Sequence, residues 1–172
     1  MKKIDIYTDG ACQPNPGQCG CGIALYENDN LTTLFSGGYM PRATNNIAEL
    51  NALYYALITV DKYIKNKETC KFTIYSDSSY SINCITKWAY GWKKANWKRK
   101  KGDIKNLELI KNIFFLYEKL KSKIKIKHVK GHSGVEGNEL ADRMAILAIK
   151  EERKVIKEIS QPYNIEEILL YS

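Results

Sequence analysis

The sequence lacks the cysteine and histidine patterns that stabilise many small folds. Its five cysteines are an odd number at irregular spacing, which is not the pattern of a disulfide framework. Cys19 and Cys21 are separated by one residue and have no further cysteine or histidine group nearby, so the sequence does not indicate a zinc site. We therefore expect reduced thiols and a cytoplasmic location.

Long hydrophobic runs, internal repeats and low-complexity segments are also absent. No run of eighteen apolar residues exists, which predicts that the chain does not span a membrane. Residues 1–3 lead directly into a strand pattern rather than into the apolar core of a signal peptide. At 172 residues the chain is expected to form one domain that needs no disulfide or structural metal to fold.

Positive charge is present in excess and is unevenly distributed. The net charge is +8 and the pI is about 9.1. Between residues 93 and 105, seven basic residues stand against a single acid, Asp103, and aromatic residues are interleaved with them. A localised positive field indicates a polyanionic partner, most simply a nucleic acid. The alternating lysines of residues 119–130 are more typical of a solvated face.

Hydrophobic periodicity predicts the element order β-β-β-α-β-α-α-β-α. Strands are expected at residues 3–9, 20–28, 31–39, 71–76 and 123–129. Helices are expected from Thr44 or Asn45 to about 62, and at 78–87, 104–121 and about 136–152. This order predicts an α/β fold, with a five-stranded mixed sheet of three antiparallel strands and then two parallel strands, and helices on both faces. Residues 1–152 would form this domain, and residues 153–172 an appendage of unknown role.

Four carboxylates stand where a folding chain has little structural reason to place a charge. Asp9 and Asp77 each end an apolar, strand-like run, whereas Glu49 and Asp142 interrupt the apolar faces of two predicted helices. Such acids repel one another unless a cation lies between them, and hard cations such as Mg²⁺ prefer oxygen ligands. Four acids can hold two Mg²⁺ ions roughly 3.5–4 Å apart, an arrangement that hydrolyses phosphodiesters.

Each of these acids also has an ordinary structural explanation. Asp9 could form a turn, and Asp77 could cap the helix that follows it. Glu49 could complement a helix dipole, and Asp142 could pair with Arg143 or a nearby lysine. The prediction of a metal site therefore depends on the four acids together.

Short motifs surround the four acids and occur in a characteristic order. They are Tyr7-Thr8-Asp9-Gly10 with Asn15-Pro16-Gly17, then Thr44 to Leu50, then Tyr75-Ser76-Asp77-Ser78, and finally Val129 to Gly134 with Gly137 to Asp142. Together they resemble the type 1 ribonuclease H family over nearly the whole chain to about residue 150. The resemblance implies the ribonuclease H-like fold. It also implies an endonuclease that cuts the RNA strand of an RNA–DNA hybrid with little sequence specificity, leaving a 5′-phosphate and a 3′-hydroxyl.

The resemblance also implies roles for individual residues. Asp9, Glu49, Asp77 and Asp142 would hold two Mg²⁺ ions, with Mn²⁺ as a possible substitute, and His132 would assist proton movement or product release. Residues 88–105 resemble a basic protrusion that holds the DNA strand through its phosphates. The residues implied to bind substrate are Cys12, Asn15, Arg42, Thr44, Asn45, Asn46, Ser79, Trp92, Lys93, Lys94, Lys98, Asn106 and Asn138. Among them, Arg42, Thr44 and Asn106 would form a phosphate pocket, and Ser79 stands where bacterial relatives usually have glutamine.

Several of these residues keep an alternative explanation. Asn15 could serve turn chemistry, Asn45 and Asn46 could cap a helix, and Trp88 could belong to a local cluster that supports the basic projection. The other histidine, His128, lies in a strand pattern and is expected to be structural.

Two other functions remain open at this point. One is a module that binds a hybrid or duplex RNA without hydrolysing it, which the presence of all four acids disfavours. The other is a different nuclease on the same fold, such as a junction resolvase, a proofreading exonuclease or the nuclease part of a reverse transcriptase. The Gly-His-Ser-Gly loop at residues 131–134 and the Trp-Lys-Lys segment at 92–94 favour the hybrid enzyme. We expect a monomer whose partner is an RNA–DNA hybrid.

Overall fold

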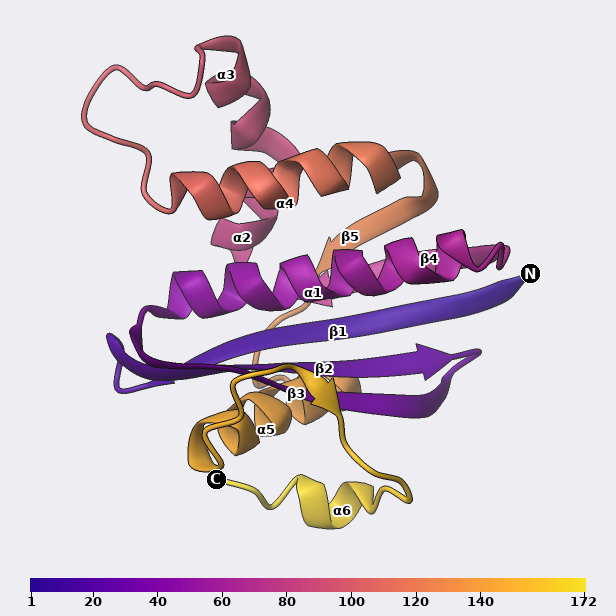
Figure 1. The fold of residues 1–172 in the computed structure, drawn as a ribbon. Helices are drawn as coiled ribbons and strands as arrows, with labels where there is room; N and C mark the ends of the chain where they lie inside the picture. The colour runs from indigo at the N-terminus through magenta and orange to yellow at the C-terminus, as the bar shows by residue number, and fades with distance from the viewer.

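The computed structural model describes residues 1–172 and contains one mixed sheet of six strands (Figure 1). The strands are β1 (Lys2–Gln13), β2 (Gly17–Glu27), β3 (Asn30–Ala43), β4 (Cys70–Ser76), β5 (Ile124–His128) and β6 (Lys157–Glu158). Their order across the sheet is β5-β4-β1-β2-β3-β6. β1, β2 and β3 are antiparallel, and β4 and β5 run parallel to β1. The predicted α/β fold with a mixed sheet is confirmed.

The predicted number of five strands is wrong, because the chain adds a sixth at the β3 edge. Glu158 and Lys157 of β6 pair with Phe35 and Ser36 of β3. Two residues are too few to produce the alternation of apolar and polar side chains that marks a strand in a sequence. The C-terminal segment, residues 153–172, thus contributes a short edge strand to the sheet.

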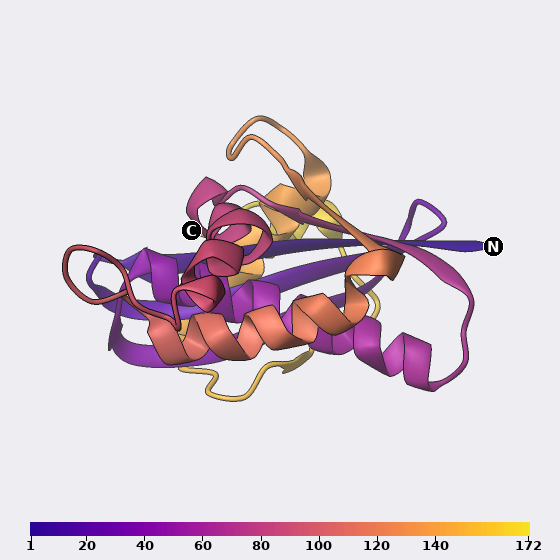
Figure 2. The same cartoon turned by 90° about the horizontal axis from the view of Figure 1, so that it is seen from above.

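Helices lie on both faces of the sheet, as predicted (Figures 1 and 2). They are α1 (Asn45–Lys65), α2 (Ser79–Asn83), a π-helical turn (Cys84–Trp88), α3 (Ala89–Lys94), α4 (Leu107–Leu120), α5 (Glu136–Lys150) and α6 (Ile165–Ile168). The helix expected at residues 78–87 therefore continues to Lys94. Helices α1 and α4 cover one face, and α5 and α6 cover the other. No helix is both long and apolar enough to cross a membrane.

Three hydrophobic clusters hold these layers together, and the two larger ones lie on opposite faces of the sheet. The larger cluster lies beneath α1 and α4 and includes Leu50, Leu53, Leu57 and Val60, the apolar positions of the predicted first helix. The smaller cluster lies on the other face and consists of Ala24, Leu34, Leu140, Met144 and Ile168. Since Ile168 comes from α6, the C-terminal segment contributes to this second core.

The cysteines differ from expectation at one pair. Cys12 of β1 lies directly opposite Cys19 of β2, and the two side chains form a disulfide. Cys21, Cys70 and Cys84 are free thiols, as expected. The expectation that all five thiols are reduced is therefore wrong in this structure. The pairing depends on the β1–β2 register, with the two Cα atoms 4.0 Å apart, and a sequence spacing of seven residues does not reveal that register.

Candidate active site and nucleic-acid interface

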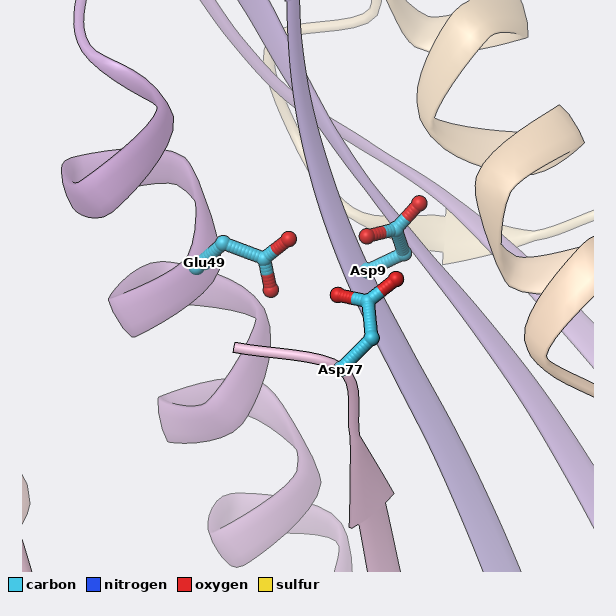
Figure 3. Close-up of side chains that lie close together, drawn as sticks. All are labelled: Asp9, Glu49 and Asp77. Atoms are coloured by element: carbon cyan, nitrogen blue, oxygen red, sulfur yellow. The ribbon is translucent and has the colours of Figure 1, made fainter. Parts of the chain in front are cut away.

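Three of the four predicted carboxylates converge at one edge of the sheet. Thr8 and Ser76 are paired across the parallel strands β1 and β4, so the next residues, Asp9 and Asp77, emerge side by side. Glu49 reaches the same point from the first turns of α1 (Figure 3). One carboxylate oxygen from each of the three acids lies within 4.8 Å of the others. These three acids belong to the four carboxylates that the sequence predicts to hold a metal.

Two glycines allow the helices to approach Asp9 closely. A side chain at Gly10 would overlap the main chain of Ala48 and Glu49, so the absence of one lets α1 pack directly on β1. Gly22 is paired with Asp9 across β1 and β2, and a side chain there would overlap the main-chain carbonyl of Ala141 in α5. The two glycines thus bring the helices that carry Glu49 and Asp142 to either side of Asp9.

The start of α1 is fixed by Thr44, one of the two predicted N-caps. The Thr44 hydroxyl accepts a hydrogen bond from the Ile47 main-chain N–H at 3.3 Å. Asn15 accepts a hydrogen bond from the Asn45 N–H through its side-chain oxygen at 3.0 Å, which ties the loop after β1 to the same helix end. Both polar side chains therefore have a structural function at the rim of the site.

The acid cluster is electrostatically strained. Asp9 is 5% exposed and Glu49 is 7% exposed. Burial, followed by the charge of Glu49, raises the pKa of Asp9 well above its usual value. Burial also raises the pKa of Glu49 to about 8, with the Asp77 charge contributing, although a hydrogen bond with Asp9 partly offsets the effect. The Glu49 Oε2 atom is buried without a hydrogen-bond partner.

These carboxylates fit a divalent cation. An all-oxygen donor set with an unpartnered buried oxygen is what a hard cation such as Mg²⁺ requires. A cation would also offset the mutual repulsion that, after burial, contributes to the two raised pKa values. Asp9, Glu49 and Asp77 are therefore the residues that could hold a metal ion together.

Asp142 lies beside this cluster rather than within it. It lines the same cavity, and its charge contributes to the raised pKa of Asp9. However, its Oδ2 atom accepts a hydrogen bond from Arg143 Nη1 at 2.7 Å, and it is not among the acids whose oxygens lie within 4.8 Å of one another. The alternative explanation of Asp142, an ion pair with Arg143, is thus present in the structure.

Asp9 and Asp77 do not follow their alternative explanations. Ser78, not Asp77, caps α2, since its hydroxyl accepts a hydrogen bond from the Ser81 N–H at 3.1 Å. Asp9 lies within the β1 ladder opposite Gly22 rather than in a turn. Neither residue therefore has a local structural function that would account for its carboxylate.

Two side chains support Asp77 from neighbouring elements. Asn138 of α5 is 3% exposed and donates a hydrogen bond from its side-chain amide to Asp77 Oδ2 at 3.3 Å. The imidazole Nε2 of His128 lies 3.2 Å from the Asp77 main-chain oxygen, which fits the structural role expected of this histidine. Asn138 was expected to contact substrate, but here it is buried and holds the carboxylate.

A cavity of about 370 Å³, which we call the acid pocket, opens above the four acids. His132 lines it from the loop before α5, together with Cys12, Gln13, Asn45 and Asn46. The sulfur of Cys12 is occupied by the bond to Cys19. Of the predicted substrate-binding residues, Cys12, Asn45 and Asn46 therefore border the acids directly.

A second cavity of about 700 Å³, which we call the basic cleft, adjoins the acid pocket at α1. Six predicted residues line it: Asn15, Thr44, Asn45, Asn46, Trp92 and Asn106. Trp88, Arg99 and Lys105, which belong to the predicted basic protrusion of residues 88–105, also line it. Tyr80 lines it too and was not predicted to bind substrate. Tyr80 could have been found from its spacing, because it precedes Trp88 by eight residues, which places both on one helix face.

Several predicted substrate residues do not line either cavity. They are Arg42, Ser79, Lys93, Lys94, Lys98 and Asn138. Lys93 instead pairs with Glu118 of α4 at 3.0 Å and lies over the ring of Phe114. Of the predicted phosphate pocket, Thr44 and Asn106 share the basic cleft, whereas Arg42 lies outside its lining.

Burial of the two tryptophans is the reverse of the expected order. Trp88, expected in a local supporting cluster, is 44% exposed. Trp92 is half-buried and packs against the main core. Their ring centroids lie 6.2 Å apart, so the pair forms one aromatic wall of the basic cleft.

Known proteins resemble this chain over most of its length. A family model described as RNase H matches residues 1–150. The Ribonuclease HI of Haemophilus ducreyi is 43% identical over 149 residues, which cover 86% of this chain and 90% of that protein. The Ribonuclease HI of Haemophilus influenzae is 44% identical over 146 residues, covering 84% and 88% of the two chains.

Solved structures share the fold. LC9-RNase H1, a type 1 RNase H with the type 2 active-site motif, superposes with a TM-score of 0.75 at 23% identity, over 97% of this chain and 80% of that one. LC11-RNase H1, solved in complex with an RNA/DNA hybrid, superposes with a TM-score of 0.65 at 23% identity, over 87% of this chain and 98% of that one. At these identities the likeness concerns the fold alone.

Proposed function

Because this chain belongs to the ribonuclease H family, we propose that it is an endoribonuclease that hydrolyses the RNA strand of RNA–DNA hybrids. The products would carry a 5′-phosphate and a 3′-hydroxyl. One observation supports this most directly: the carboxylates of Asp9, Glu49 and Asp77 meet within 4.8 Å although they come from three different elements. Structural explanations of the single acids do not account for this convergence.

The proposed metal ligands are Asp9, Glu49, Asp77 and Asp142, and the proposed cofactor is a pair of Mg²⁺ ions, which Mn²⁺ could replace. When bound, such ions activate a water and stabilise the leaving oxygen of a phosphodiester. Burial raises the pKa values of Asp9 and Glu49, so protons compete with a cation for these carboxylates. Asn138 keeps the Asp77 carboxylate oriented through its hydrogen bond.

His132 is proposed to move protons at the mouth of the acid pocket. It is exposed and lines the cavity that holds the four acids. An imidazole nitrogen can accept a proton from the attacking water or deliver one to the departing oxygen. This role requires no direct contact with the buried carboxylates.

The two cavities suggest how a hybrid is held. Asn45 and Asn46 line both of them, so these amides would contact the minor groove between the two strands. The RNA strand would lie over the acid pocket near Cys12, where its 2′-hydroxyl distinguishes it from DNA. The DNA strand would lie in the basic cleft, with Asn15, Thr44 and Asn106 at its sugar–phosphate backbone and Trp88 and Trp92 against the sugars.

The exposed cations of residues 93–105 would add phosphate contacts around this cleft. Arg99 and Lys105 line it directly. Lys94 and Lys98 are exposed near it and, with Arg42, Ser79 and Lys93, complete the proposed binding surface. Contacts to phosphate and sugar position a duplex without reading its sequence, so we propose little sequence specificity. We also propose that residues 1–152 form the catalytic domain and that the protein is a cytoplasmic monomer.

The proposal is tested with end-labelled RNA–DNA hybrid, duplex RNA and duplex DNA, each with Mg²⁺ and with EDTA. The expected result is cleavage of the hybrid's RNA strand alone, which stops in EDTA. Comparable cutting of duplex DNA would indicate another nuclease of the same fold. Binding of the hybrid without products would indicate a module that recognises hybrids without hydrolysing them.

A further inference from the structure

Asp142 is the only one of the four proposed ligands that is held by a cation of the chain itself. Arg143 Nη1 donates to its Oδ2 atom at 2.7 Å, and the two side chains are only 16% and 19% exposed. On a helix, neighbouring residues do not face each other. Other contacts of Arg143 therefore orient its guanidinium toward Asp142.

Two further acceptors orient the Arg143 side chain. Its Nη2 donates to Glu139 Oε2, one turn earlier in α5, at 3.3 Å. Its Nε donates to the main-chain carbonyl of Leu169, in the C-terminal segment, at 3.1 Å. All three nitrogens of the guanidinium thus have acceptors, which fixes the planar fork in one orientation.

The Leu169 carbonyl is itself held in place by packing of the C-terminal segment. Leu169 directly follows α6, which lies beneath α5 in Figure 1. Ile168, the preceding residue, is buried in the second core against Leu34, Leu140 and Met144. The hydroxyl of Tyr163 accepts a hydrogen bond from the Leu34 N–H at 3.1 Å and donates one to the Ile159 carbonyl at 2.7 Å. The segment therefore presents a fixed acceptor to Arg143.

We propose that Arg143 is a positioning residue that keeps the Asp142 carboxylate away from the acid cluster. The C-terminal segment fixes the orientation of Arg143 through the hydrogen bond to the Leu169 carbonyl. The inference rests on the proposed function, because it takes Asp142 to be a metal ligand. A cation that uses Asp142 must share the carboxylate with a guanidinium or displace it. Arg143 thus weakens the cation site to which Asp142 contributes and leaves the site formed by Asp9, Glu49 and Asp77 the stronger one.

The direct test is titration of the full-length protein with Mg²⁺ by isothermal calorimetry, without nucleic acid. In Arg143→Gln the weaker Mg²⁺ site is expected to tighten on the order of tenfold, at the lower end of what changes around metal ligands produce. Arg143→Lys keeps the charge but loses the fork that joins Leu169 to Asp142, so it should tighten the same site by a smaller factor. Lys150→Gln removes an exposed charge from the same helix and should leave both affinities unchanged.

A second variant tests the route through the C-terminal segment. Asn164 caps α6 by accepting a hydrogen bond from the Glu167 N–H at 3.1 Å, and it is exposed and remote from the acids. Asn164→Ala should loosen α6 and tighten the weaker Mg²⁺ site about twofold. In the Arg143→Gln background the same substitution should have no effect, because the link it acts through is gone.

The outcomes separate this inference from the proposed function. If Arg143→Lys binds Mg²⁺ like the wild type, charge alone explains the effect and the positioning role is wrong. Unchanged or weaker binding in Arg143→Gln also overturns it, as does an Asn164→Ala effect that persists without Arg143. In each of these cases the wild type still binds Mg²⁺ and cleaves hybrids. A wild type that neither binds Mg²⁺ nor cleaves hybrids would overturn the proposed function and this inference together.

Discussion

The acid pocket and the basic cleft share Asn45 and Asn46, yet they are built in opposite ways. In the acid pocket, Asp9 and Glu49 are almost completely buried and come from elements that pack through glycine contacts. In the basic cleft, Arg99 and Lys105 are exposed and come from a loop between helices. Charged side chains are therefore buried in the acid pocket and exposed in the basic cleft.

This difference separates two tasks that a nuclease must perform. Buried like charges are costly, but the surrounding core holds them at fixed positions, which suits chemistry that tolerates little displacement. Exposed cations cost the fold little and act over a Debye length of about 10 Å, which suits capture of a polyanion in many registers. Changes in the acid pocket should therefore alter turnover, and changes in the basic cleft should alter affinity.

The variant Asp9→Asn should have the largest effect, and it tests most directly whether the acid pocket governs turnover rather than affinity. The substitution keeps the shape of the side chain but removes a charge from the cluster, so we expect kcat to fall by about 10³-fold or more, equivalent to several kcal/mol of transition-state stabilisation. Hybrid affinity, measured by fluorescence anisotropy in EDTA, should stay within about twofold of the wild type, since surface cations dominate binding. Asp29→Asn removes an exposed acid from the β2–β3 turn and serves as the control. Retained turnover in Mg²⁺ would remove Asp9 from the proposed site.

The matching change in the basic region replaces Lys98, Arg99, Lys100 and Lys101 with alanine. We expect KM to rise about tenfold and the slope of log KM against log salt to fall by up to about 3, because each phosphate contact contributes close to one unit. The value of kcat should hardly change. A salt slope equal to that of the wild type would show that these residues do not touch phosphate.

The control for this variant removes the same charge elsewhere. Lys71, Lys123, Lys125 and Lys127 are all exposed around β4 and β5, and the last three belong to residues 119–130, which are interpreted as a solvated lysine face. Their replacement with alanine should leave the salt slope nearly unchanged. A similar loss of affinity in both variants would mean that net charge, rather than the position of the basic cleft, governs binding.

The acid pocket was predictable from the sequence because its geometry follows from strand ends. Asp9 and Asp77 each end a run of alternating residues, and parallel neighbouring strands place such ends together. Glu49 follows from the helical spacing of Leu50, Leu53 and Leu57. Convergence of the two strand ends also requires that β1 and β4 are neighbours, which local periodicity does not predict and the structure shows.

Contacts between residues far apart in the chain could not be predicted in this way. The Arg143–Asp142 pair was among the alternatives read from the sequence, but the hydrogen bond from Arg143 to the Leu169 carbonyl, 26 residues further on, was not. The Cys12–Cys19 bond depends on strand register, and β6 is too short to carry a periodic signal. Lys93 belonged to a basic run, but it pairs with Glu118 of α4 and does not line the cleft. In each case the deciding partner leaves no trace in the local sequence.

Trp88 and Trp92 separate substrate binding from support of the fold within the basic cleft, with smaller expected effects. Trp88 is largely exposed in the basic cleft, so Trp88→Ala should weaken hybrid binding about fivefold, by roughly 1 kcal/mol, with little change in Tm. Trp92 packs against the main core, so Trp92→Ala should also destabilise the fold by roughly 3 kcal/mol. Hybrid binding and thermal melts measured on both variants check this. Equal loss of Tm would show that Trp88 also supports the core.

The smallest expected effect is a dependence of stability on pH that arises in the acid pocket alone. Burial raises the pKa of Glu49 from 4.5 to about 8. Between these values the folded state keeps a proton that the unfolded chain releases, so the stability of the metal-free protein should fall as pH rises through this window. We expect the Tm of the wild type to drop relative to that of Glu49→Gln as the pH rises through this window, and thermal melts at several pH values measure the difference.

Addition of Mg²⁺ should reverse the sign of this dependence. A bound cation favours the ionised carboxylates, so the wild type should gain Tm as pH rises toward 8, and binding should release protons into the buffer. Calorimetry in two buffers of different ionisation enthalpy measures that release directly. Changes to the exposed cations of the basic cleft should leave this proton release unchanged, because they do not share the buried carboxylates. If the four-alanine variant of residues 98–101 alters it, the two regions are electrostatically coupled and the division between turnover and affinity is too simple.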